Sequence, residues 1–88
     1  MIAKIHPSAK IHPEATIHDG VFIGSDVIVN RHAVVGTGAT IGRDANIAPY
    51  TTVGTGAVIE CSTHTKKHQH VPAHHRLSSD GTVVEIAS

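Results

Sequence analysis

The feature that most constrains this sequence is a six-residue repeat running through its first two thirds. From Ile5 to Ile59 an aliphatic residue stands at every sixth position. Four positions later each repeat has a small or β-branched residue, as in Ala9, Val27 and Thr51. Six residues are too few for a helix and its return, and the period matches neither a helix nor a simple alternating strand. The repeat therefore predicts a β-solenoid, in which each unit is one short strand and a turn.

Three such units can close a triangular coil, so residues eighteen positions apart should stack on neighbouring strands. The glycines support this coil length, because Gly20, Gly38 and Gly56 are spaced eighteen apart. The aliphatic column should point into the prism, where β-branched side chains pack well. The alanine column should also point inward, near the corners, where little more than a methyl group fits. The uninterrupted repeats amount to just over three coils.

Six stretches of the sequence resemble the hexapeptide-repeat acyltransferase family: IHPSAK, IHPEAT, IGSDVI, VGTGAT, IGRDAN and VGTGAV. The resemblance runs from Ile5 to about His64. It implies an all-β fold, a left-handed parallel β-helix, and the handedness comes from the family alone. It also implies a homotrimer of prisms placed side by side about a threefold axis. One β-helix domain is expected over residues 1–64, followed by a His-rich tail over residues 65–88 that is extended or forms a short hairpin.

The small size of the chain also favours oligomerisation. A chain of 88 residues normally needs disulfides, a metal or a partner subunit to be stable. Its single cysteine, Cys61, excludes an intramolecular disulfide and favours a reducing, cytoplasmic setting. The outward positions Phe22, Ile28, Val34 and Val58 are unusually apolar, which suits contacts between subunits.

The charge pattern excludes several classes of partner. Lys and Arg together number seven, as do Asp and Glu, so a nucleic-acid or anionic-membrane surface is not expected. The N-terminal residues lack the apolar stretch of a signal peptide, and no apolar run approaches transmembrane length. The resemblance implies a small-molecule acceptor as the substrate.

One column of the coil gathers chemically useful side chains: Glu14, His32 and Tyr50 are eighteen residues apart. A carboxylate next to a histidine can hydrogen-bond the imidazole and fix its tautomer, as in general-base sites. The resemblance implies that His32 is the general base, at the seam between two prisms, and that Glu14 orients it. Asn30 and Tyr50 are the candidate substrate contacts. The alternative is that His32 is an exposed or inter-subunit structural histidine.

The remaining histidines do not predict a metal site. His6, His12 and His18 fall on three successive sides of the triangle, so they cannot converge on one ion. His68 and His70 would lie on one face of a strand, a spacing suited to a transition metal. The His spacing of the γ-class carbonic anhydrases, which share the fold, is absent, so no metal is required. Further along the tail, the turn Ser78–Gly81 between apolar residues predicts the hairpin.

The resemblance implies an acyltransferase-like protein that moves an acetyl group from acetyl-CoA to a hydroxyl or amine of a sugar or small metabolite. The sequence departs from the enzyme pattern in three ways. No long loop interrupts the repeats, no nucleotide-sugar or Rossmann-like domain is expected in these 88 residues, and the usual Gly-x-Pro-Ala ending is not clearly present. The alternative is a non-catalytic trimeric binding or assembly module, whose His-rich tail responds to metal or pH.

Overall fold

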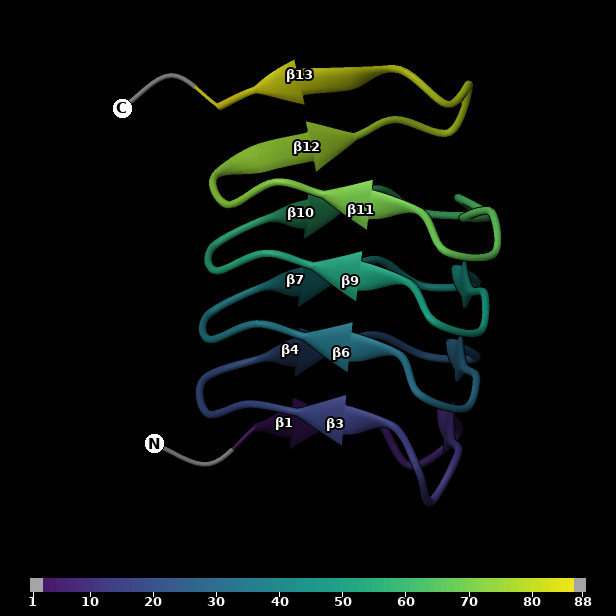
Figure 1. Cartoon of the computed structure of the whole chain (residues 1–88). Coiled ribbons are helices and arrows are strands. Elements are labelled where there is room, and N and C mark those ends of the chain that lie inside the picture. The colour runs from purple at the N-terminus through teal and green to yellow at the C-terminus, as the bar shows by residue number, and fades with distance from the viewer. Residues whose placement is uncertain (1–2, 87–88) are drawn as a thin grey trace.

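The chain is a stack of short strands joined by tight turns. A computed structural model describes residues 3–86, which contain no helix. Strands lie one above another along the stack, and the two ends of the chain lie at its opposite ends (Figure 1). The strands are β1 (Lys4–Ile5), β2 (Lys10–Ile11), β3 (Thr16–Ile17), β4 (Phe22–Ile23), β5 (Ile28–Val29), β6 (Val34–Val35), β7 (Thr40–Ile41), β8 (Asn46–Ile47), β9 (Thr52–Val53), β10 (Val58–Ile59), β11 (His70–Val71), β12 (His75–Leu77) and β13 (Val83–Glu85).

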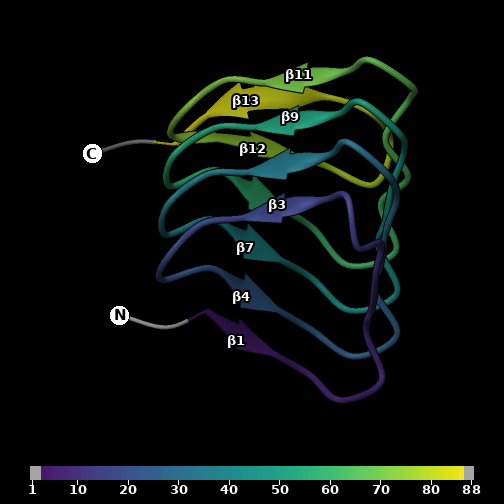
Figure 2. The same cartoon turned by 60° about the horizontal axis from the view of Figure 1, so that its bottom comes forward.

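The strands form three sheets, which are the three sides of the prism (Figure 2). The six-stranded sheet has the order β1-β4-β7-β10-β12-β13, the three-stranded sheet β2-β5-β8, and the four-stranded sheet β11-β9-β6-β3. Ile5 pairs with Ile23 and Ile11 with Val29, both in parallel register. The observed offset is therefore the eighteen residues that the repeat predicts.

The core is the column of aliphatic residues that the repeat defines. Ile23, Ile41 and Ile59 stack directly along the six-stranded sheet and are fully buried. In the first coil the same column is less covered, and Ile5 is exposed. At Thr65 the column carries a hydroxyl instead, which accepts the Ala48 N–H at 2.7 Å and contacts the Thr51 hydroxyl at 3.1 Å. These hydrogen bonds satisfy the buried oxygen and let the coil continue past the missing aliphatic residue.

Each corner is a four-residue turn, and from the turn at Gly20 to the turn at His74 its third residue has the left-handed backbone conformation. His32 has φ of 58° and Tyr50 has φ of 63°, values that are uncommon for residues other than glycine. A positive φ at the third residue is what a type II turn requires. The turn closes with a hydrogen bond from the fourth residue to the first, as from Thr51 N–H to the Ala48 carbonyl. The repeat thus determines both where the strands lie and which turn residues, such as His32 and Tyr50, have a positive φ.

The coil extends beyond the uninterrupted repeats to about four turns. β11 and β12 lie after His64, the expected end of the β-helix domain. β11 pairs in parallel with β9, and β12 pairs in parallel with β10. β13 then turns back and pairs with β12 in antiparallel register. The stack therefore ends in an antiparallel edge strand.

The turn between β12 and β13 has a pH-sensitive hydrogen bond. The backbone N–H of Thr82 donates to Oδ1 of Asp80 at 2.9 Å, and this contact, followed by one from the Thr82 hydroxyl, lowers the pKa of the Asp80 carboxyl. Because the folded pKa is depressed, the stabilisation is present above the unfolded pKa of about 4 and is lost as pH falls through the lower folded value. We expect the NMR shift of the Thr82 amide to titrate in this acid range and to stay flat in Asp80→Asn. A wild-type amide that does not titrate would contradict the contact.

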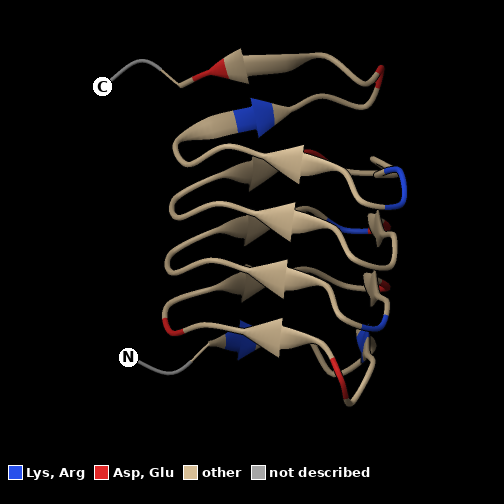
Figure 3. Ribbon diagram, viewed as in Figure 1, with Lys and Arg blue, Asp and Glu red and all other residues tan. Residues whose placement is uncertain are grey.

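Acidic and basic residues are interspersed, and most of them lie toward the right-hand side of the stack in the view of Figure 3. In the part of the chain that the structure describes, no helix is long and apolar enough to cross a membrane. Most of the charged and titratable side chains lie in the corner turns, so the corners are where they can contact one another.

Candidate active site

The corner between the three-stranded and four-stranded sheets carries a column of titratable side chains. Glu14, His32, Tyr50 and His68 are each the third residue of a turn at this corner. The backbone holds the upper three in line, because the N–H of Tyr50 donates to the Arg31 carbonyl and that of His68 to the Pro49 carbonyl, both at 3.2 Å. The positive φ at His32, Tyr50 and His68 gives the three residues the same backbone conformation. The structure thus brings together three predicted site residues and adds His68.

The three rings of this column stack on one another. The ring centroids of His32 and Tyr50 are 5.0 Å apart with an interplanar angle of 18°. Those of Tyr50 and His68 are 4.9 Å apart at 19°. The ammonium nitrogen of Lys67 lies 6.0 Å from the centroid of Tyr50, at the limit of a cation–π contact. This stack holds the plane of the His32 imidazole from one side.

Glu14 lies on the other side of His32. Its Oε1 is 3.6 Å from Nε2 of His32, with side-chain exposures of 58% and 45%. This separation is that of an ion pair and is longer than a hydrogen bond. Between exposed groups such a pair contributes little to stability. For chemistry its effect is on the tautomer, because a carboxylate beside Nε2 favours the proton on that nitrogen and leaves Nδ1 as the basic one.

Asn30 has a structural task. Its amide nitrogen donates to Oδ1 of Asn46 at 3.1 Å and to the carbonyl of Ile47 at 2.7 Å. Both donors of the side chain are therefore used in holding one coil to the next. The carbonyl oxygen of Asn30 is the group left for a substrate, and the role in substrate binding stays a prediction.

The expectation that His68 and His70 share one face of a strand is wrong. His68 lies in the turn before β11 with φ of 65°, and its ring stacks on Tyr50. His70 lies on β11, beside Thr52 of β9. The six-residue register continues through this segment, so His68 falls in a turn and only His70 falls in a strand. Among residues 3–86, no group of three or more His, Cys, Asp or Glu side chains could hold a metal ion.

The hollows of the surface lie away from His32. One of about 510 Å³ surrounds the exposed Phe22, and another of about 410 Å³ lies beside Val58, both on the six-stranded sheet. Neither is lined by any residue of the Glu14–His32–Tyr50–His68 column. The other two apolar outward residues are on different sides, Ile28 on the three-stranded sheet and Val34 on the four-stranded sheet. Neither of these two hollows can therefore hold a substrate against His32.

Comparison with known proteins supports the repeat architecture. Residues 20–55 match the bacterial transferase hexapeptide family in its six-repeat form. No curated protein sequence matches the chain. The resemblance to hexapeptide-repeat proteins is thus confirmed, and the segment that matches spans the second coil and most of the third.

Solved structures of similar shape include a mutant of GDP-perosamine N-acetyltransferase from Caulobacter crescentus in complex with CoA and GDP-perosamine. It is 16% identical with a TM-score of 0.55, and the match covers 94% of this chain and 56% of that one. Another is a hexapeptide transferase family protein from Anaplasma phagocytophilum, 11% identical with a TM-score of 0.41, over 98% and 80% of the two chains. The first likeness confirms the fold, a left-handed parallel β-helix of hexapeptide repeats. This chain spans about half the length of that enzyme.

Proposed function

We propose that this hexapeptide-repeat chain is one subunit of a homotrimeric acyltransferase that uses acetyl-CoA. The observation that carries the proposal is the pair of Glu14 and His32, 3.6 Å apart at an exposed corner of the prism. The match of residues 20–55 to a transferase family supports it. The CoA and sugar nucleotide in the C. crescentus structure belong to that enzyme, and they suggest the ligands to test here. The acceptor would be a hydroxyl or amine of a sugar or small metabolite.

In the proposed reaction His32 acts as general base. Its basic nitrogen takes a proton from the acceptor hydroxyl or amine as the oxygen or nitrogen attacks the thioester carbonyl carbon. The tetrahedral intermediate then expels the thiolate of CoA, which takes the proton back from the imidazolium. Glu14 stabilises the imidazolium while the proton is held, and the stacked Tyr50 ring keeps the imidazole in place. Acetyl-CoA supplies the acyl group, so the chain itself forms no covalent bond.

The corner position explains why the proposal includes a trimer. A base that works on a thioester needs a site that limits access of water, since enclosure strengthens its electrostatic contacts. His32 is 45% exposed in one chain, and the two hollows are elsewhere. A second prism placed against this corner would supply the missing wall of the groove.

The binding half of the proposal is tested by titrating the protein with acetyl-CoA and CoA while recording NMR signals of Tyr50 and the histidines. We expect saturable shifts at His32 and Tyr50, and sedimentation at the mass of three chains. Binding should weaken on dilution below the concentration at which the trimer dissociates. A trimer that binds no CoA thioester at millimolar concentration would reject the enzyme and favour the non-catalytic assembly module.

A further inference from the structure

The turns of the coil share a hydrogen bond that links each coil to the one beneath it. In the upper coils the N–H of the third turn residue donates to the carbonyl of the second residue of the turn below. Examples are Asp44 to the Ser25 carbonyl at 2.9 Å and Tyr50 to the Arg31 carbonyl at 3.2 Å. The third residue therefore has a backbone donor that lacks this carbonyl wherever a turn has no other turn beneath it, and a side chain or water can accept it there.

The turns 6–9, 12–15 and 18–21 are in this position, because within residues 3–86 no turn lies beneath them. In the first two, the ring of the histidine at the first position accepts the free donor. The Nδ1 of His6 accepts the Ser8 N–H, and that of His12 accepts the Glu14 N–H, each at 3.1 Å. A proline follows each histidine and fixes φ of the second residue. The imidazole thus supplies the acceptor that a carbonyl supplies in the upper coils.

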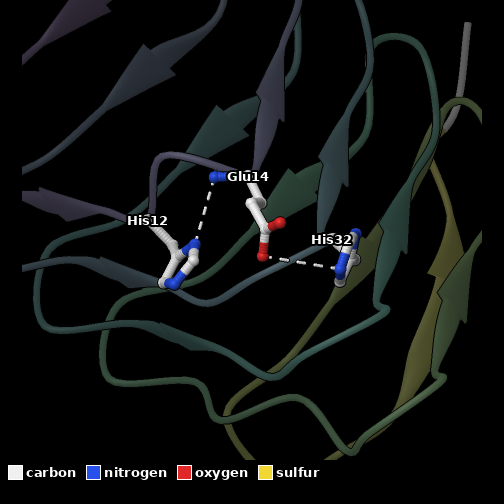
Figure 4. Close-up of polar contacts among 3 residues, drawn as sticks. All are labelled: His12, Glu14 and His32. Atoms are coloured by element: carbon white, nitrogen blue, oxygen red, sulfur yellow. Dashed lines mark hydrogen bonds and ion pairs between the residues drawn. The ribbon is translucent and has the colours of Figure 1, made fainter.

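His12 is linked in this way to the candidate active site. The residue whose N–H it accepts is Glu14, and the carboxylate of Glu14 lies against His32 (Figure 4). We infer that His12 is a positioning residue: through the backbone of Glu14 it holds the carboxylate beneath the His32 imidazole. The catalytic half of this inference rests on the proposed function. The acceptance of the Glu14 N–H by Nδ1 of His12, called the cap below, rests on the hydrogen bond alone.

The cap works in only one protonation state. An imidazole that accepts at Nδ1 carries its proton on Nε2, and a second proton would turn Nδ1 into a donor facing another donor. The charged groups around His12 are Lys10 and Glu14 on its own coil, and Arg31 and His32 from the turn above. Protonation of His12 therefore releases the turn that carries Glu14.

His6 provides a matched control within the same coil. It has the same His-Pro turn and the same backbone contact to the third residue, Ser8. The Ser8 hydroxyl also lies 2.8 Å from Nδ1 of His6 and accepts the Asp26 N–H at 2.8 Å. Lys4 and Asp26 are the charged residues nearest to it in register. Removing this cap should loosen the first coil at another corner and leave the Glu14–His32 pair in place.

The test is amide hydrogen exchange, residue by residue, in the full chain. In His12→Ala we expect the Glu14 amide to exchange about five- to tenfold faster, the effect of losing one hydrogen bond, while Ser8 is unchanged. His6→Ala should give the reverse pattern. His12→Asn should restore protection at Glu14, because an Asn oxygen accepts the N–H two residues on.

Activity separates the cap from the positioning role. In a protein that transfers acetyl groups, His12→Ala should lower kcat by about ten- to a hundredfold, as misplacement of a catalytic group does. The KM for acetyl-CoA should stay unchanged, His12→Asn should recover most of the rate, and His6→Ala should match the wild type. If the Glu14 amide keeps its wild-type exchange in His12→Ala, the cap is wrong. If it exchanges faster while kcat is unchanged, the positioning role is wrong. A wild type with no transfer defeats the proposed function and leaves the exchange result valid.

Discussion

Replacing His32 with alanine is expected to reduce the rate of acetyl transfer by about 10² to 10⁴, the typical contribution of a general base. The side chain is exposed and lies on a corner, so its loss removes none of the buried aliphatic core. The oligomeric state and the melting temperature should therefore stay close to those of the wild type. Steady-state assay of thiol release from acetyl-CoA measures the first effect, and differential scanning calorimetry with sedimentation measures the second.

The control for this prediction is another exposed histidine on a different corner, His18. His18→Ala removes the same imidazole and should keep the wild-type rate, because it takes no part in the Glu14–His32–Tyr50–His68 column. Glu14→Gln should fall between the two, since the amide keeps the size of the side chain but loses its charge. A His32→Ala protein that retains most of its activity would remove His32 from the mechanism.

Replacing Ile41 with alanine is expected to cost about 2–5 kcal/mol of unfolding free energy, the usual loss for a large buried aliphatic side chain. Ile41 is fully buried and packs between Ile23 below and Ile59 above. The rigid spacing of the coils prevents their collapse into the cavity. Urea unfolding at one fixed protein concentration measures the change, since subunit assembly makes apparent stability depend on concentration.

Thr40 is the matched control for Ile41, because it is the neighbouring residue on β7 and is only partly buried. Thr40→Ala should change the unfolding free energy by less than about 1 kcal/mol, as for substitutions outside the core. Equal losses in the two variants would show that the aliphatic column is not the main source of stability.

The fold was predictable because every repeat has the same length. A constant period makes the residue at position i lie over the residue at i+18, so the inward column and the three sides follow from counting. The same count places His68 above Tyr50, but the break in the aliphatic column at Thr65 made residues 65–88 look like a separate tail. Thr65 satisfies its hydroxyl with Ala48 and Thr51, and the register continues. A hydroxyl in a core column has no sequence signal that reveals its partners.

The sequence by itself determined the stacking of Glu14, His32 and Tyr50, because backbone register in a solenoid follows from the constant length of the repeat. Only the tertiary structure decided what each side chain does within that register. In the structure the amide nitrogen of Asn30 donates to Asn46 and Ile47. The Glu14 carboxylate lies 3.6 Å from Nε2 of His32, and the Glu14 N–H donates to Nδ1 of His12. These outcomes depend on side-chain torsions and on which donors lack a coil beneath them. Both are properties of three-dimensional neighbours, which a one-dimensional period does not contain.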